Sequence, residues 1–125
     1  MILHESAEMY LETIHVLSQQ QDVVHAVDIA RHMGFSKPTI SEWMVKLVEA
    51  GYVNNDDGHI SLTDAGLEVA TKVYARHLVL EDVLKKIGVS DDVAEEDACR
   101  IEHYISDETF NAFKKLAASL PEASS

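Results

Sequence analysis

The residues best suited to chemistry lie in one short segment, Asp97-Ala98-Cys99-Arg100-Ile101-Glu102-His103. In a helix, positions i, i+3 and i+4 share one face, so the thiolate of Cys99, the carboxylate of Glu102 and the imidazole of His103 could converge on one point. Ligands of such different softness suit Fe²⁺, Co²⁺, Ni²⁺ or Zn²⁺ better than Mg²⁺ or Ca²⁺. The alternative is an exposed Glu-His pair beside a buried structural thiol.

Two further pairs have helical spacing. His77 and Glu81 are four residues apart, and Met9 and Glu12 are three apart. Either pair could add metal ligands from one helix face, although His-Glu pairs are common on surfaces and methionine at this spacing is more often core. The acidic run from Glu95 to Asp97 could complete a second metal site, or could stabilise the positive end of a helix.

Cys99 is the only cysteine, so the chain forms no internal disulfide. A Cys-His hydrolase would be another use for Cys99 and His103. Such an enzyme needs an oxyanion loop and a third residue that orients the base, and the sequence offers neither in recognisable form. We therefore do not expect an enzyme.

A second group of polar residues could contact DNA. Ser36 is typical of a helix N-cap, and Pro38 suits the first turn that follows it. In a helix-turn-helix, the N-terminal residues of the second helix contact phosphates and base edges. Hydroxyl groups, amines and one carboxylate in this helix could make such contacts, although its outer face could also be merely polar. The candidates are Ser36, Lys37, Pro38, Thr39, Ser41, Glu42 and Lys46.

Hydrophobic spacing and caps predict the elements around these residues. We expect Ile40, Val45 and Val48 to face the core from the helix that carries the DNA candidates. Extended runs on either side of a turn-rich segment predict a β-hairpin. The predicted elements are helices over Glu5–Gln20, Asp28–His32 (closed by Gly34) and Ser36–Gly51, strands at Tyr52–Val53 and His59–Leu62 around the turn Asn54–Gly58, and helices over 64–87, 90–105 and 107–120.

This order of elements predicts a mainly α fold. Residues 1–63 would form a winged helix-turn-helix DNA-binding domain with a two-stranded wing, and residues 64–125 an all-helical metal-binding and dimerisation domain. The long helix at about 64–87 would link the two domains.

The charge of the chain limits how it could bind DNA. The net charge is −12, and residues 1–63 contain three basic residues, Arg31, Lys37 and Lys46, against nine acidic ones. Such a chain cannot coat nucleic acid by charge alone, so we expect strongly salt-dependent binding that is weak without metal. We also expect a cytoplasmic protein without membrane contact, because no apolar run approaches about 18 residues and the first residues do not resemble a signal peptide.

Several segments resemble the family of the diphtheria toxin repressor, the iron-dependent repressors and the manganese transport regulators. They are Glu8–Ile14, Ser36–Ser41, Arg76-His77, Asp97–His103 and Ser106–Glu108. The resemblance implies that a metal ion bridges the first helix and the helix after the long linker. It also implies that the metal-bound dimer binds palindromic operators of metal-uptake genes.

The resemblance also assigns ligands by position. Met9, Cys99, Glu102 and His103 resemble the primary activating site of the iron-responsive branch, whereas Glu12 matches a carboxylate of the manganese branch. His77 and Glu81 resemble the ancillary site, and Glu95 stands where the iron branch has a histidine. Glu42 replaces a glutamine of the diphtheria repressor's reading helix. The sequence ends without a region resembling the SH3-like domain of longer members.

The expected function is therefore that of a homodimeric repressor that binds double-stranded operator DNA when loaded with Fe²⁺ or Mn²⁺. Zn²⁺, Co²⁺ or Ni²⁺ could act as surrogates, and no small organic substrate is expected. Metal and DNA binding would be linked, because a metal that prefers the DNA-competent state shifts the population toward it. The alternative is a winged-helix repressor that responds to a non-metal ligand.

Overall fold

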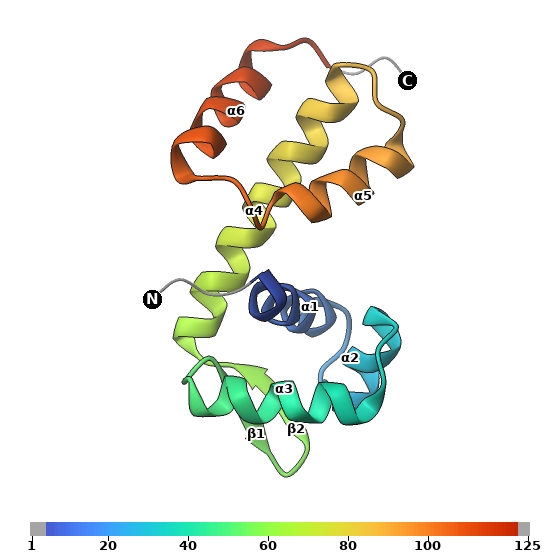
Figure 1. Cartoon of the computed structure of the whole chain (residues 1–125), viewed down its shortest axis with the longest axis vertical. Helices are drawn as coiled ribbons and strands as arrows, with labels where there is room; N and C mark the ends of the chain where they lie inside the picture. The colour runs from blue at the N-terminus through green and yellow to red at the C-terminus, as the bar shows by residue number, and fades with distance from the viewer. Residues whose placement is uncertain (1–4, 123–125) are drawn as a thin grey trace. The chain divides into compact units, whose positions relative to one another are not determined.

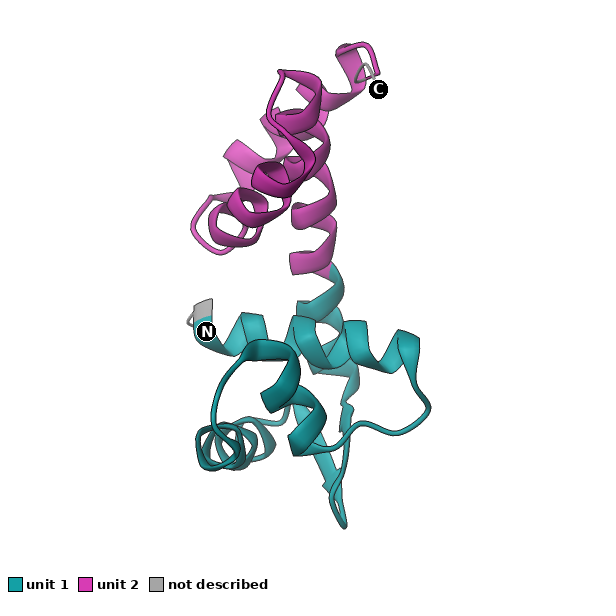
Figure 2. Cartoon of the chain, turned by 90° about the vertical axis from the view of Figure 1, so that its right-hand side faces the viewer, with its two compact units in different colours: residues 1–71 teal, residues 72–125 magenta. Residues whose placement is uncertain are grey.

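The computed structural model describes residues 5–122 and contains two compact units, residues 1–71 and residues 72–125 (Figure 2). The boundary falls inside helix α4 (Asp64–Lys86), about two turns beyond the expected division at residue 63. The first turns of α4 belong to the first unit because Ala70 is part of its hydrophobic core.

The first unit consists of three helices, a hairpin and the start of α4 (Figure 1). Its largest fully buried side chains are Leu11, Ile14, Ile29, Ile40 and Val53. They come from all three helices and the first strand, so one core holds the helix-turn-helix and the wing together. The elements are α1 (Glu5–Gln20), α2 (Ala26–Met33), α3 (Lys37–Glu49), β1 (Val53–Asp56) and β2 (His59–Leu62).

Local signals set most of these boundaries. The bounds of α1 are as predicted, and α2 ends as predicted at Gly34, whose φ of 73° is left-handed. Helix α2 begins two residues before its predicted start at Asp28. The reason is that the Asp28 carboxylate accepts a hydrogen bond from the backbone N–H of His25, at 2.9 Å, and so caps an earlier first turn.

The buried face of α3 differs from the expected one. Ile40, Met44 and Leu47 are buried, whereas Val45 and Val48 are 59% and 41% exposed. The expectation that both valines face the core is therefore wrong. Positions 40, 44 and 47 are spaced i, i+4 and i+7 and define one stripe, and Val45 lies about 100° around the helix from Met44.

The wing is an antiparallel pair in which Val53 lies opposite Leu62. Its turn consists of only Asp57 and Gly58, with φ values of 53° and 90°, which is the geometry that two-residue hairpins prefer. The turn is shorter than predicted because the preceding residues continue the strand. Val24 also pairs with Ile60, whose N–H donates to the Val24 carbonyl at 2.8 Å.

The start of α4 is fixed by a close backbone approach. The Thr63 hydroxyl donates to the carbonyl of Gly51 at 2.7 Å and accepts from the N–H of Gly66 at 3.1 Å. A Cβ added at Gly66 would lie 2.0 Å from the carbonyl oxygen of Tyr52. Only glycine therefore fits at this position.

The second unit contains the rest of α4 together with α5 (Asp91–Ile101) and α6 (Asp107–Ser119). Helix α5 ends four residues before the predicted Ile105. Beyond Ile101, the carbonyls of Glu102 and Ile105 accept hydrogen bonds from Arg76 of α4 rather than from a continuing helix. Within the described residues, no helix has the length and apolar content that a membrane span requires.

Candidate metal centre and nucleic-acid interface

His77, Cys99 and Glu102 form a cluster in the second unit. Nδ1 of His77 lies 2.9 Å from Oε2 of Glu102 and 3.7 Å from Sγ of Cys99. The three ligand atoms all lie within 4.8 Å of one another. Cys99 is exposed and Glu102 is fully buried, so the cluster opens to solvent on its thiol side. One nitrogen, one sulfur and one oxygen donor are a set that fits a divalent transition-metal ion.

The Glu102 carboxylate contacts two imidazoles. Its second oxygen, Oε1, lies 3.2 Å from Nε2 of His103. Glu102 caps α5 and keeps helical backbone angles, φ −56° and ψ −25°, so the expected i, i+3 relation to Cys99 holds although the helix ends one residue earlier. His103 lies in the turn that follows. That Cys99 and His103 share one ion stays a prediction.

The environment of His77 strongly favours its protonated form. The neighbouring thiol of Cys99, followed by the carboxylate of Glu102, raises the pKa of His77 from 6.5 to about 10. Without metal, an imidazolium therefore supplies the positive charge beside the buried carboxylate. A metal ion bound through Nδ1 must displace this proton, so binding releases it.

Two of the three expected ancillary residues lie close together, and their assignment as ligands stays a prediction. Oε1 of Glu81 lies 3.9 Å from Nε2 of His77, the ring nitrogen that does not face Cys99. Glu81 is therefore close enough to His77 for both side chains to contribute to one site. Glu95 is exposed on α5 and is not part of the cluster. The four-residue spacing of His77 and Glu81 did not indicate that His77 would contact Cys99 and Glu102.

Met9 and Glu12 lie on α1 in the first unit. Met9 is 37% exposed, so it is not a core residue of that unit, and Glu12 is half-buried. This exposure argues against the core position that a methionine at helical spacing usually has. The assignment of both residues as ligands stays a prediction.

The candidates for DNA contact at the start of α3 divide into two groups. Ser36 caps the helix, accepting from the Thr39 N–H at 3.4 Å, and its hydroxyl lies 2.8 Å from that of Thr39. These two side chains therefore hold the start of the helix. The other candidates, Lys37, Pro38, Ser41, Glu42 and Lys46, are exposed and available to a partner.

Two further features of this surface were not predicted. Nζ of Lys46 lies 4.8 Å from the ring centroid of Trp43, which restrains the ammonium group. A groove lined by residues of α3 and the wing, among them Ser41, Val45 and Asn55, follows the same surface. Only the tertiary packing of the hairpin could reveal it.

Comparisons with known proteins identify both units. A family model for the N-terminal DNA-binding domain of iron-dependent repressors matches residues 2–58, and one for their metal-binding and dimerisation domain matches residues 63–122. The transcriptional regulator MntR of Escherichia coli O157:H7 is 32% identical over 111 residues, which is 88% of this chain and 72% of that protein.

The chain belongs to the iron-dependent repressor family.

Other relatives match the chain over different shares of their own length. The diphtheria toxin repressor of Corynebacterium diphtheriae is 32% identical over 116 residues, and the chain spans 51% of its length. An uncharacterized HTH-type regulator of Methanocaldococcus jannaschii is 29% identical, and the match spans 92% of it. Among solved structures, a manganese-dependent transcriptional repressor in complex with manganese is 32% identical with a TM-score of 0.83, over 90% of this chain and 52% of that one.

Membership of the iron-dependent repressor family confirms the expected class. The chain is a metal-dependent transcriptional regulator, not an enzyme, and its cofactor is a divalent metal ion. The predicted mainly α fold with a winged helix and a helical second domain is also confirmed.

Proposed function

We propose that the chain is a repressor that binds palindromic operator DNA as a homodimer when loaded with Fe²⁺ or Mn²⁺, and that it controls metal-uptake genes. The observation that carries this proposal is the cluster of His77, Cys99 and Glu102 in the segment that matches the family's metal-binding and dimerisation domain. The cytoplasm is the compartment that this function requires.

The proposed ligands fall into two sets. We assign His77 to an ion held with Cys99 and Glu102, because these side chains already lie together, and keep Glu81 beside it as an ancillary ligand. We retain the primary set that the resemblance implies, Met9, Glu12, Cys99, Glu102 and His103, and leave Glu95 as the weakest ancillary candidate. Cys99 and Glu102 would then serve both sets.

The mixed donors leave two physiological ions open. The thiolate of Cys99 favours Fe²⁺, Co²⁺, Ni²⁺ or Zn²⁺, whereas the carboxylates favour Mn²⁺. Structures of relatives have been obtained with manganese, with Zn²⁺ and with Cd²⁺. Zn²⁺, Co²⁺ and Ni²⁺ are accordingly useful surrogates in binding experiments.

The proposed DNA contact uses the exposed start of α3. Two copies of α3 separated by about 34 Å, one turn of DNA, would read a two-fold symmetric site. Lys37 and Lys46 would contact phosphates, while Ser41 and Glu42 would reach base edges. Because the chain carries a net charge of −12, this contact depends on placed cations and weakens steeply with salt.

Fluorescence anisotropy with a selected palindromic duplex tests the proposal. Binding should require Mn²⁺ or Fe²⁺, under anaerobic conditions, and should not appear with Mg²⁺ or a chelator. His103→Ala should lose the metal response while keeping the fold, and Glu68→Gln, an exposed carboxylate on α4, should behave as the wild type. Metal-independent binding, or an unchanged response in His103→Ala, would contradict it.

Isothermal titration distinguishes the proposed metal-dependent repressor from the alternative, a repressor that responds to a non-metal ligand. The metal-dependent protein gives a stoichiometric heat with Mn²⁺ or Fe²⁺. If operator binding is present and neither ion gives heat, the non-metal alternative is correct.

A further inference from the structure

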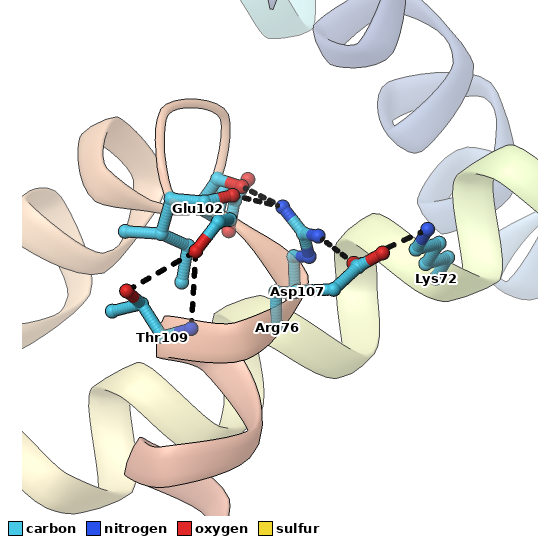
Figure 3. Close-up of polar contacts among 7 residues, drawn as sticks. Lys72, Arg76, Glu102, Asp107 and Thr109 are labelled. Carbon is cyan, nitrogen blue, oxygen red and sulfur yellow. Dashed lines mark hydrogen bonds and ion pairs between the residues drawn. The ribbon is translucent and has the colours of Figure 1, made fainter.

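Arg76 binds the turn that carries Glu102, without being part of the metal cluster (Figure 3). Its Nη1 donates to the carbonyls of Glu102, at 3.3 Å, and Ile105, at 2.8 Å. Its Nη2 donates to Oδ1 of Asp107. The side chain of Arg76 is 11% exposed and its bonds to the two carbonyls are partly buried, whereas the Asp107 side chain is 67% exposed.

Glu102 is therefore held by two consecutive residues of α4. Arg76 contacts its main-chain oxygen, and His77 contacts its carboxylate at 2.9 Å. The backbone of residue 102 is fixed independently of its side chain. This arrangement sets the direction in which the carboxylate points before any metal binds.

The acceptors of Arg76 span the whole segment between α5 and α6. Glu102 is the C-cap residue of α5, and Asp107 begins α6. Asp107 also lies 3.4 Å from Nζ of Lys72, a second cation on α4 (Figure 3). A planar guanidinium can serve three acceptors in fixed directions, whereas an ammonium group cannot match that geometry.

We propose that Arg76 is a positioning residue for metal binding, which presets Glu102 toward His77 and Cys99 and thereby sets the metal affinity. The inference rests on the proposed function of the His77, Cys99 and Glu102 cluster. If the turn were not held, metal binding would have to order it. The free-energy cost of that ordering would lower the metal affinity. Outer-shell partners of this kind change metal affinity by about 10–100-fold.

Lys86 supplies a matched control. Its Nζ donates to the carbonyl of Ala117 at 2.8 Å, and its side chain is 7% exposed. Like Arg76, it is a buried cation of α4 that binds a main-chain carbonyl of a later segment. Its bond does not involve residue 102, so Lys86→Met reports a loss of tertiary stability alone.

The experiment compares the full chain with Arg76→Met, Arg76→Lys and Lys86→Met. Thermal unfolding of the metal-free proteins measures the structural effect, and titration with Mn²⁺ measures the Kd. Co²⁺ provides a spectroscopic readout, because its absorption reports thiolate ligation and coordination geometry. The Arg76→Lys variant keeps the charge and tests the same idea if Arg76→Met does not fold.

Both methionine variants should lower the melting temperature. Only the Arg76 variants should raise the Kd for Mn²⁺, by about 10–100-fold in Arg76→Met and less in Arg76→Lys, and only they should alter the Co²⁺ spectrum. Wild-type affinity and spectrum in folded Arg76 variants would overturn the inference, as would an equal loss of affinity in Lys86→Met. If the wild type binds neither Mn²⁺ nor Co²⁺, the proposed function itself fails.

Discussion

Replacing Glu102 with glutamine removes the charge at the centre of the cluster while keeping the shape of the side chain. The carboxylate is fully buried and lies 2.9 Å from His77 and 3.2 Å from His103. Glutamine is uncharged and retains only one carbonyl oxygen, because its amide nitrogen can donate but not accept. The variant therefore loses one charged contact and weakens the other.

The expected loss of stability follows from these contacts. A hydrogen bond to a charged group contributes about 1.5–3 kcal/mol, and breaking a buried ion pair costs about 3–5 kcal/mol. His77 can release its proton once the carboxylate is gone, which relieves part of the penalty. We expect the free energy of unfolding of the metal-free protein to fall by about 2–3 kcal/mol.

The effect on metal binding should be larger. Glu102 would donate an oxygen directly to the ion, whereas outer-shell changes alone alter metal affinity by about 10–100-fold. The Kd for Mn²⁺ in Glu102→Gln should therefore rise by more than about 100-fold. Urea denaturation of the metal-free protein and isothermal titration with Mn²⁺ measure the two effects.

Glu81→Gln is the matched comparison. Glu81 faces the other nitrogen of His77 at 3.9 Å and is 20% exposed, and pairs near the surface contribute about 1 kcal/mol or less. The free energy of unfolding of Glu81→Gln should change by no more than this pair contributes. The Kd of this variant for Mn²⁺ should rise by at most about 10–100-fold. If the two variants lose equal stability and equal affinity, Glu102 is not the shared anchor of the cluster and the reasoning is refuted.

Three further predictions concern pH, DNA contact and folding. The pKa of His77 is raised from 6.5 to about 10. The contribution of His77 to stability is therefore complete below about pH 6.5 and is lost as the pH rises toward 10. Denaturation curves of the metal-free protein at several pH values measure this loss. Over the same range the affinity for Mn²⁺ should rise, since fewer protons compete for the ligands. Lys46→Ala should weaken operator binding at all sequences and lower the slope of log K against log salt by about 1, measured by anisotropy at several salt concentrations. Gly66→Ala places a methyl group 2.0 Å from the Tyr52 carbonyl and should destabilise the first unit by about 2–3 kcal/mol in denaturation, while a near-neutral effect would show that α4 can shift.

Some residues of the site could be predicted from the sequence and others could not. The i, i+3 relation of Cys99 and Glu102 survives because Glu102 keeps helical backbone angles at the end of α5. His77 is 22 residues from Cys99 along the chain and meets it only when α4 packs against α5. No spacing rule relates residues on different helices, so the pairing could not be predicted.

The sequence by itself determined the features that depend on neighbouring residues. Ser36 and Ser106 each cap the helix that follows, Gly34 ends α2 in a left-handed conformation, and Asp57-Gly58 forms the turn of the wing. Each depends on side-chain size and on hydrogen bonds within a few residues, which the local chain fixes before any tertiary contact forms.

Tertiary structure decided the features that depend on partners from elsewhere in the chain. Packing leaves Val45 and Val48 exposed. Arg76 of α4 donates hydrogen bonds to the carbonyls of Glu102 and Ile105, and α5 ends at Ile101. The donors of the cluster come from α4 and from the end of α5 in the same way. A backbone carbonyl or a ligand atom can be satisfied by whichever group lies nearest in space, and only the fold determines which group that is.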